Sequence, residues 1–310
     1  MHSLAVILAA PQRIELRPLP LAPIAETDVL VEIAWSGIST GTEKLLWSGA
    51  MPPFPGMGYP LVPGYESVGQ IVEAGARVRA RVGEWVFVPG ANCFEGAHAL
   101  FGGSAERVVL PSPRALRIDP AIGERGVLLA LAATAHHAIA GGLTPELIIG
   151  HGILGRLIAR LTIALGAPPP MVWETNPQRR AGAMGYAVIA PELDGRHDYR
   201  TICDASGAGA QLDSWIARLA RGGEIVLAGF YDKLGFAYPG AFMREARLRI
   251  AAEFTREDSR AVIALVEAGA LSLDGLVSHV RPVSEAPQAY AAAFEDPSCV
   301  KMVLDWRAAK

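Results

Sequence analysis

A glycine-rich segment, Gly150-His151-Gly152-Ile153-Leu154-Gly155, constrains the fold of this chain more than any other feature. It follows the apolar run Leu147–Ile149 and opens an amphipathic segment, residues 153–165, expected to be a helix. In this strand-to-helix context the first glycine permits a tight turn, the second lets a pyrophosphate approach the backbone, and the third lets helix and strand pack closely. Amides at the helix N-terminus then hold the anion. The predicted dinucleotide-binding residues are Gly150, Gly152, Ile153, Leu154 and Gly155.

The next expected strand, residues 171–174, ends in an acidic residue, Glu174. It falls about 20 residues beyond the glycine turn, where dinucleotide sites place the carboxylate that binds the ribose. That carboxylate accepts hydrogen bonds from the ribose hydroxyls and repels a 2′-phosphate, so the sequence predicts NAD rather than NADP. Arg179 and Arg180 leave alternatives open, because either side chain can reach a 2′-phosphate, flank the adenine or lie on a solvated helix face. Arg179 is included among the candidate cofactor-binding residues.

The pattern of apolar residues changes near Pro120. Before it, short runs rich in Val and Ile are separated by Gly and Pro, which is typical of an irregular β domain. After it, strands alternate with helices, which predicts an α/β fold with a parallel sheet covered on both faces. We expect strands at residues 4–9, 28–35, 65–73, 84–88, 105–110, 146–149, 171–174, 201–204, 224–228, 247–251, 277–281 and 300–306, and helices at 121–140, 153–165, 177–184, 211–219, 256–267 and 283–294.

Composition narrows the possible classes of function. The 310 residues carry a formal net charge of −3 and no basic tail, which argues against recruitment to nucleic acid or an anionic membrane. The longest apolar stretch, residues 127–140, contains His136 and His137 and falls short of the roughly 20 residues that a membrane span needs. The cysteines are widely separated and form no C-x-x-C pair. We therefore expect a cytoplasmic protein with no nucleic-acid partner and no membrane span.

Further motifs lie along almost the whole chain. They are Asp28-Val29-Leu30-Val31-Glu32, Gly64-Tyr65-Glu66-Ser67-Val68-Gly69, Gly222-Gly223-Glu224-Ile225-Val226-Leu227-Ala228-Gly229 and Lys301-Met302-Val303-Leu304. With these motifs and the glycine turn, the chain resembles the medium-chain dehydrogenase/reductase superfamily. The resemblance implies a GroES-like, β-barrel-like substrate domain, residues 1–122 completed by 275–310. It also implies a Rossmann domain with a doubly wound parallel sheet, residues 123–274.

Many members of this superfamily bind a catalytic zinc through three side chains. The matching positions here are Ser39, Tyr65 and Ala130, and none of these residues is a good zinc ligand. The loop 89–103 stands where some members bind a structural zinc through four cysteines, and it contains only Cys93. The resemblance therefore implies a zinc-free enzyme.

Three histidines leave an alternative metal site open. His98 lies in the loop 89–103, while His136 and His137 lie in the expected helix 121–140. We give a site built from them less weight, because adjacent histidines on one helix are expected to point apart.

Residues 37–66 carry a more specific resemblance. The segment reads Gly37-Ile38-Ser39-Thr40-Gly41-Thr42-Glu43-Lys44-Leu45-Leu46-Trp47-Ser48-Gly49 and, after Ala50, continues Met51-Pro52-Pro53-Phe54-Pro55-Gly56-Met57-Gly58-Tyr59-Pro60-Leu61-Val62-Pro63-Gly64-Tyr65-Glu66. It is similar to the bacteriochlorophyllide a dehydrogenases of bacteriochlorophyll biosynthesis, which oxidise a 3-(1-hydroxyethyl) group on a chlorin ring to 3-acetyl. This resemblance implies an NAD-dependent alcohol dehydrogenase with a chlorin-type small-molecule substrate. For the oligomeric state of the chain we consider a homodimer.

Oxidation of a secondary alcohol without zinc needs a side chain that accepts or relays the proton of the alcohol. Tyr65 replaces a metal ligand in the resemblance and is expected to face the reacting centre. Glu66 is expected to orient Tyr65 or carry protons, and Ser39 and Thr40 to bind the substrate oxygen, with Glu43 as a further candidate base. Structural alternatives stay open, because the hydroxyls can shape a turn and Glu43 can cap the following short helix.

Two Gly/Pro-rich loops, residues 48–63 and 89–103, are expected to help form the walls of a pocket for a flat apolar ligand, with ordinary core packing as the alternative. His98 is a candidate ligand of the chlorin magnesium, although a lone loop histidine more often binds nothing. The side chains expected in the walls are Trp47, Met51, Phe54, Met57, Tyr59, Phe94 and Phe101.

Two other functions remain compatible with these motifs. One is a zinc-free, NADPH-dependent enone or quinone reductase of the same superfamily, which Glu174 argues against. The other is a non-catalytic protein that binds NAD as a structural or sensing ligand. Cofactor preference distinguishes the NADPH-dependent reductase from the NAD-dependent dehydrogenase. Measurement of turnover distinguishes an enzyme from the non-catalytic protein.

Overall fold

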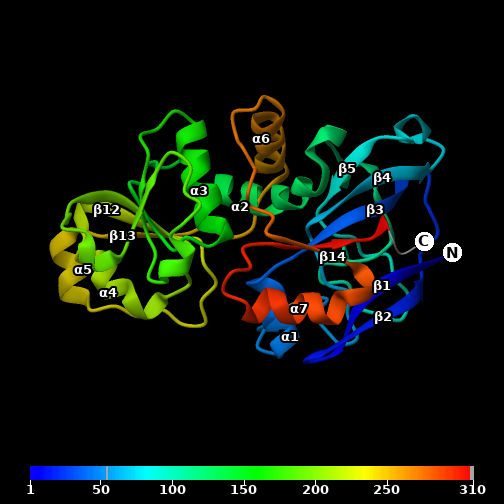
Figure 1. The fold of residues 1–310 in the computed structure, drawn as a ribbon, viewed down its shortest axis with the longest axis horizontal. Helices are drawn as coiled ribbons and strands as arrows, with labels where there is room; N and C mark the ends of the chain where they lie inside the picture. Colours follow the sequence, from blue (N-terminus) through cyan, green and yellow to red (C-terminus); the bar gives the residue numbers. More distant parts are fainter. Residues whose placement is uncertain (54, 308–310) are drawn as a thin grey trace. The chain divides into compact units, whose positions relative to one another are not determined.

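The computed structural model describes residues 1–53 and 55–307. The chain forms two compact units (Figure 1): a first unit of Met1–Ala130 with Asp274–Lys310, and a second unit of Leu131–Leu273. The first unit is therefore discontinuous in sequence. It extends to Ala130, beyond the expected boundary at residue 122, because the 3₁₀ segment Pro120–Leu128 packs against two of its strands, β3 and β4. Phe54, which we expected in a pocket wall, lies outside the described residues.

A seven-stranded, mostly antiparallel sheet forms the centre of the first unit. Its order is β14-β15-β3-β4-β5-β7, with β6 also paired to β3, and β1 and β2 form a separate antiparallel ribbon. Met302 of β15 lies opposite Ile38 of β3, so the C-terminal segment runs beside the end of the strand that leads to Ser39. The strands are β1 (His2–Ala10), β2 (Arg13–Pro20), β3 (Asp28–Ile38), β4 (Ser67–Ala74), β5 (Trp85–Val88), β6 (Arg107–Pro111), β7 (Leu116–Arg117), β14 (His279–Pro282) and β15 (Met302–Asp305).

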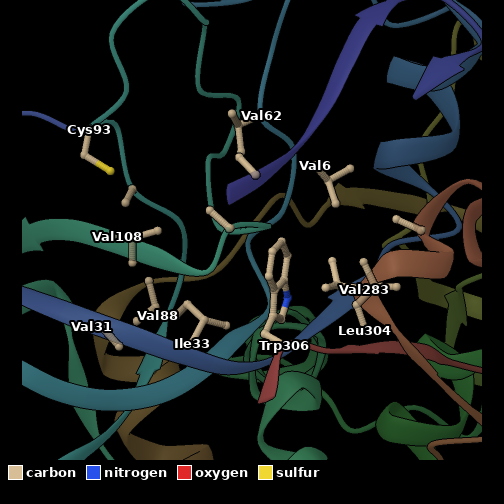
Figure 2. Packing of buried hydrophobic residues seen from close by; sticks show 14 of the residues in the cluster. Val6, Val31, Ile33, Val62, Val88, Cys93, Val108, Val283, Leu304 and Trp306 are labelled. Atoms are coloured by element: carbon tan, nitrogen blue, oxygen red, sulfur yellow. The ribbon is translucent and has the colours of Figure 1, made fainter. Parts of the chain in front are cut away.

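The core of the first unit joins residues from distant parts of the chain. Val31 and Ile33 of β3 point toward Val108 of β6 and Trp306 after β15 (Figure 2), and all four side chains are buried. Burial of apolar surface contributes roughly 25 cal/mol per Å², so large side chains such as Trp306 matter most. The Trp306 indole N–H also donates to Ser36 Oγ at 2.8 Å, which fixes the last strand to β3.

The second unit is built on a six-stranded parallel sheet of order β10-β9-β8-β11-β12-β13. Its central strands β8 and β9 are short and apolar, as expected where helices cover both faces. On β8, Leu147 and Ile149 join one apolar cluster while Ile148, which points to the opposite face, is also fully buried. The strands are β8 (Leu147–Ile149), β9 (Met171–Trp173), β10 (Ala187–Ile189), β11 (Tyr199–Asp204), β12 (Leu219–Leu227) and β13 (Arg247–Ile250).

Helices pack against both sheets. In the second unit, α3 packs on β8, while α4 and α5 pack on β12 (Figure 1). In the first unit, α7 packs on β2, β14 and β15. Among the described residues every helix is too short or too polar to cross a bilayer. The helices are α1 (Thr42–Ser48), α2 (Leu129–Ile139), α3 (Ile153–Ala164), α4 (Leu212–Ile216), α5 (Tyr238–Arg244), α6 (Arg256–Glu267) and α7 (Ala286–Glu295).

Three expected helices differ from the structure. The helix expected at 211–219 is shorter, because α4 ends at Ile216 and strand β12 begins at Leu219. The helix expected at 121–140 is interrupted at Gly123, whose φ of 59° is not helical, and divides into the 3₁₀ segment Pro120–Leu128 and α2. The helix expected at 177–184 is wrong, because the structure has only the 3₁₀ turn Pro177–Arg179 there. Gly182 and Gly185 adopt positive φ values of 82° and 81°, which end any helical path through this segment.

Candidate functional site

A hydrogen-bonded pair joins Ser39, directly after β3, to Tyr65, just before β4. Ser39 Oγ lies 2.7 Å from Tyr65 Oη, and either hydroxyl can donate. The Tyr65 hydroxyl also lies 3.5 Å from Thr42 Oγ1, and its ring meets the edge of Phe101 with centroids 5.1 Å apart. Burial raises the pKa of Tyr65 well above its ordinary value. Tyr65 therefore remains a neutral phenol near pH 7, able to donate and accept hydrogen bonds but unsuited to act as a phenolate base.

Glu43, in the first turn of α1, is fully buried beneath this pair. Its Oε1 accepts a hydrogen bond from the Ser39 N–H at 3.3 Å, and its Oε2 accepts one from the Tyr290 hydroxyl at 2.7 Å. Burial raises the pKa of Glu43 to about 8, so the carboxyl is mainly protonated at neutral pH. In the described chain no side chain caps α1, so Glu43 is not the helix cap that the structural alternative required.

Glu66 forms a buried ion pair with Lys301, which precedes β15. Lys301 Nζ also donates to the carbonyl of Ile38 at 3.0 Å. A Cβ atom at Gly37 would lie 2.2 Å from Glu66 Oε2 and 2.9 Å from Lys301 Cε, so the pair requires glycine there. Burial raises the pKa of Glu66, whereas the charge of Lys301 opposes that shift.

The contacts of Glu66 differ from its expected role and include a lysine that was missed in the sequence. Among the described residues Glu66 Oε1 has no hydrogen-bond partner, so Glu66 does not orient Tyr65 through a direct hydrogen bond. Lys301 is the first residue of the Lys301-Met302-Val303-Leu304 motif, which indicated only the family resemblance. Its signal was a single lysine at the start of an apolar terminal strand, and the charge on Glu66 explains why it is buried.

The structure gives less support to the roles expected for Thr40 and His98. In the described part of the chain the Thr40 hydroxyl has no hydrogen-bond partner, whereas the hydroxyl of Thr42, a further candidate from the sequence, lies beside Tyr65 Oη. The His98 ring lies against the other loop, because a Cβ at Gly58 would be only 2.6 Å from its Nε2. Its distal edge thus faces backbone, and this arrangement gives no support to magnesium ligation.

Most of the expected pocket-wall residues pack inside the protein. Met51 belongs to a small cluster of buried apolar residues, and partly buried Met57 and Tyr59 pack against it. Trp47 packs against the same cluster and contacts the ring of Phe294, with centroids 5.4 Å apart. Phe94 packs against the main core. Core packing therefore accounts for these side chains, while Phe101 contacts Tyr65 directly.

The side chains at the three positions that the resemblance matches to zinc ligands do not fit a zinc ion. Two oxygens bound to tetrahedral zinc at about 2.0–2.2 Å lie roughly 3.3–3.6 Å apart, farther than a hydrogen-bonded pair. Ser39 Oγ and Tyr65 Oη are 2.7 Å apart, and Ala130 offers no side-chain donor. Within residues 1–53 and 55–307, no group of three or more His, Cys, Asp or Glu side chains is arranged to hold a metal ion.

The expectation that His136 and His137 point apart is wrong. Their Nδ1 atoms both reach Asp258, at 2.7 and 2.8 Å, and occupy its two carboxylate oxygens. Asp258 also forms a capping box with Thr255 at the start of α6. The carboxylate therefore lies between the two rings and joins α2 to α6, which is a structural role.

The glycine turn has the geometry that its motif requires. Gly150 has a φ of 95°, and a Cβ at Gly155 would lie 1.9 Å from the Gly150 carbonyl oxygen. Helix α3 begins at Ile153 after Gly152, and no side chain in the described chain caps it. The first amides of the helix, including those of Ile153 and Leu154, are therefore available for an anion such as a pyrophosphate.

Glu174 lies directly after β9 and is held from both sides. Its Oε2 accepts the His151 N–H at 3.0 Å and its Oε1 accepts the Asn176 N–H at 2.8 Å. The exposed Arg179 presents its carbonyl to the interior of the loop, whereas Arg180 Nε donates back to the Glu174 carbonyl at 2.8 Å. The carboxylate is thus oriented while each of its oxygens keeps a lone pair for a further donor.

His151 and Arg156, to which sequence reasoning gave no function, brace this loop. His151 Nδ1 lies 2.6 Å from the Arg179 carbonyl and Nε2 lies 2.9 Å from the Tyr186 hydroxyl. Burial lowers the pKa of His151 to about 4, so the ring is neutral near pH 7. Arg156 donates to four backbone carbonyls, those of His151, Arg179, Ala181 and Gly182. The signal for this role in the sequence was an arginine, Arg156, directly after the third glycine of the turn.

Comparison with known proteins shows which family the chain resembles. Residues 25–120 match the alcohol dehydrogenase GroES-like domain. The chain is 57% identical to the 2-desacetyl-2-hydroxyethyl bacteriochlorophyllide A dehydrogenase of Rhodobacter capsulatus, with 100% of both chains covered. It is 58% identical to the protein of the same description from Cereibacter sphaeroides, with 99% of each covered.

Solved structures show the same fold at lower identity. An alcohol dehydrogenase from Escherichia coli in complex with NADH superposes with a TM-score of 0.85 at 21% identity, covering 98% of this chain and 99% of that one. The 2R,3R-butanediol dehydrogenase of Bacillus subtilis also gives 0.85, at 19% identity, covering 98% of this chain and 100% of that one. The arrangement of a GroES-like unit and a parallel dinucleotide-binding sheet is thus shared with alcohol dehydrogenases.

Proposed function

Because the chain belongs to the family of 2-desacetyl-2-hydroxyethyl bacteriochlorophyllide A dehydrogenases, we propose that it oxidises the hydroxyethyl group of a bacteriochlorophyllide to acetyl, using NAD and no zinc. The secondary alcohol loses a hydride from carbon and a proton from oxygen, and the products are a ketone, reduced cofactor and one proton. Full-length identity of 57–58% to two such dehydrogenases supports the substrate. The Ser39–Tyr65 hydroxyl pair supports a reaction without a metal.

In this proposal the substrate alcohol hydrogen-bonds to the Ser39–Tyr65 pair. Since Tyr65 remains a neutral phenol, it positions the alcohol and passes hydrogen bonds instead of acting as a strong base. The carbinol carbon is conjugated with the macrocycle, which delocalises the positive charge that develops as the hydride leaves. The need for a Lewis acid is lower than for an ordinary alcohol, and the buried Glu43 adds negative potential nearby when it is ionised.

NAD accepts the hydride when it is bound. The residues proposed to bind it are the glycine turn with the first amides of α3, Glu174 at the ribose and the loop that carries Arg179. Glu174 supports NAD over NADP, because a buried carboxylate held by two backbone N–H groups repels a 2′-phosphate.

A homodimer formed through the second unit is part of the proposal. Strand β13 is the edge of the parallel sheet, and Ile250 on it is 75% exposed. Tyr238, Phe242 and Met243 of the neighbouring helix α5 are exposed as well. An unpaired edge strand flanked by apolar side chains favours pairing with a second copy of itself.

The decisive experiment follows the absorption spectrum of the purified protein with the hydroxyethyl bacteriochlorophyllide and either NAD or NADP. We expect conversion to the acetyl product with NAD, at undiminished rate after treatment with a zinc chelator. Activity that depends on one tightly bound zinc per chain would contradict the metal-free mechanism. Preference for NADPH with an enone would favour a reductase, and NAD binding without turnover would favour a non-catalytic protein.

A further inference from the structure

We propose that Tyr290, on α7, is a positioning residue for this reaction: with Ser104 it sets the protonation state of the buried Glu43 carboxyl behind the Ser39–Tyr65 pair. The inference rests on the proposed function of that pair. No motif in the sequence marked Tyr290 or Ser104, and both come from segments far from the pair in sequence.

Contacts around Glu43 carry the first step. Its carboxyl has one oxygen on the Ser39 N–H and the other on the Tyr290 hydroxyl, at 3.3 and 2.7 Å. All of these groups are buried, so water does not compete for the carboxyl. The Tyr290 ring is fixed by an edge contact with Phe294, with centroids 5.7 Å apart. Tyr290 is thus held in one position while its hydroxyl proton remains free to rotate.

Ser104 supplies the second step. Its hydroxyl is fully buried beside Tyr290, and it makes no hydrogen bond of good geometry within the described chain. A buried hydroxyl without a partner is costly, unless it can turn toward a neighbouring polar group. Tyr290 is that group, because its hydroxyl bonds Glu43 and also interacts with Ser104, whose hydroxyl can donate to it or accept from it.

Two hydrogen-bond patterns follow from the same heavy-atom positions. When Glu43 is ionised, the Tyr290 hydroxyl donates to Glu43 and the Ser104 hydroxyl donates to the Tyr290 oxygen. When Glu43 is protonated, its O–H donates to the Tyr290 oxygen and the Tyr290 hydroxyl donates to Ser104. Hydrogen bonds to a charged acceptor are the stronger ones, so Tyr290, supported by Ser104, favours the ionised carboxyl.

Other charged and titratable groups around Glu43 act in a fixed way. Glu66 opposes ionisation of Glu43, and Lys301, paired with Glu66, favours it. Tyr65 is neutral, and an ionised Glu43 makes its own ionisation still harder. An ionised Glu43 places a negative charge behind the Ser39–Tyr65 pair, where it stabilises the positive charge that develops at the carbinol carbon. The ionised form is therefore expected to turn over faster in the direction of oxidation.

The test uses variants along the chain of hydroxyls that ends on Glu43. Tyr290→Phe removes the donor to the carboxylate, so the rising limb of kcat against pH should move up by about one to two pH units. Ser104→Ala removes only the donor behind Tyr290, so the limb should move up by less. Glu43→Gln should abolish the limb. A general packing defect would lower kcat without moving the limb.

An infrared titration of the full-length protein without substrate provides a readout independent of activity. The C=O stretch of a protonated carboxyl that is absent in Glu43→Gln identifies Glu43, and its midpoint should rise in Tyr290→Phe and rise by less in Ser104→Ala. Tyr199→Phe is the matched control, because Tyr199 is a buried tyrosine that donates to Asp194 at 2.6 Å in the second unit. It should leave both profiles unchanged.

The outcomes separate this inference from the proposed function. Equal infrared midpoints in the wild type and Tyr290→Phe would overturn the inference, as would midpoints that shift while the kcat profile of an active enzyme stays fixed. Shifted midpoints in a protein that does not turn over the bacteriochlorophyllide would support the control of Glu43 by Tyr290 and overturn the proposed substrate.

Discussion

Ser39 Oγ and Tyr65 Oη lie 2.7 Å apart and share one hydrogen bond at two of the positions that the family resemblance matches to zinc ligands. If this pair holds the substrate alcohol, Tyr65→Phe should lower kcat about 10²–10⁴-fold, the range for groups that assist proton transfer. The dissociation constant for NAD should not change, because the glycine turn lies in the second unit. Steady-state kinetics and fluorescence titration of NAD check both expectations.

The double variant Ser39→Ala/Tyr65→Phe tests whether the hydroxyls act together. If they do, the double variant should be little slower than Tyr65→Phe alone. Near-normal turnover of Tyr65→Phe across the pH range would assign Tyr65 a space-filling role and leave Glu66 or Glu43 as the candidate base.

Glu174→Ala should narrow the preference for NAD over NADP by about 10- to 100-fold, as expected for loss of a charge-assisted hydrogen bond and of repulsion toward a 2′-phosphate. The ratio of the two dissociation constants is the measurement. Glu174→Gln is the matched variant, since it keeps the volume of the side chain and removes its charge. An unchanged ratio in both variants would mean that Glu174 does not contact the ribose.

Most strands along the chain and the glycine turn could be predicted from sequence because they depend on local patterns, whereas the short strands β7 and β10 were missed. Apolar runs marked β3 and β8, and the glycine motif marked the start of α3 within a residue. Ser39, Tyr65 and Glu43 were identified through resemblance, not through their contacts. Their partners could not be found this way, because the pairing of Glu43 with Tyr290 joins residues 43 and 290 and depends on how α7 packs.

The missed helix at 177–184 has a similar physical explanation. Its sequence has a proline start and two arginines, which suit a helix, but Gly182 and Gly185 take positive φ values. Arg156 holds the carbonyls of this loop in place of intrahelical hydrogen bonds. Such a long-range brace has no periodic pattern in the sequence, so it is visible only in the fold.

Breaking the buried ion pair should strongly destabilise the first unit. Lys301→Met leaves Glu66 without its cation, and we expect a loss of about 3–5 kcal/mol in the free energy of unfolding. The double variant Glu66→Leu/Lys301→Met removes both charges and should recover more than half of that loss. Urea unfolding of the three proteins measures the difference, and equal stability of the single and double variants would contradict the pairing.

Protonation of His151 should destabilise the second unit in acid. The pKa of His151 is about 4 in the folded protein and 6.5 ordinarily, so the unfolded chain binds more protons between these values. Stability is therefore complete above pH 6.5 and falls as the pH is lowered toward 4. His151→Gln keeps a donor and an acceptor for the loop and should make the melting temperature less dependent on pH in this window. His197→Gln, at an exposed histidine, should retain the dependence of the wild type.

Placing a charge on the edge of the parallel sheet should dissociate the proposed dimer. Ile250 on β13 is 75% exposed, and in the dimer Ile250→Asp would bury an unpaired carboxylate against the partner. We expect the dissociation constant of the dimer to rise at least about tenfold. Leu193→Asp is the control, because Leu193 is 72% exposed but lies outside β13 and α5. Sedimentation equilibrium measures both variants, and a wild-type protein that is monomeric at micromolar concentration would refute the assembly.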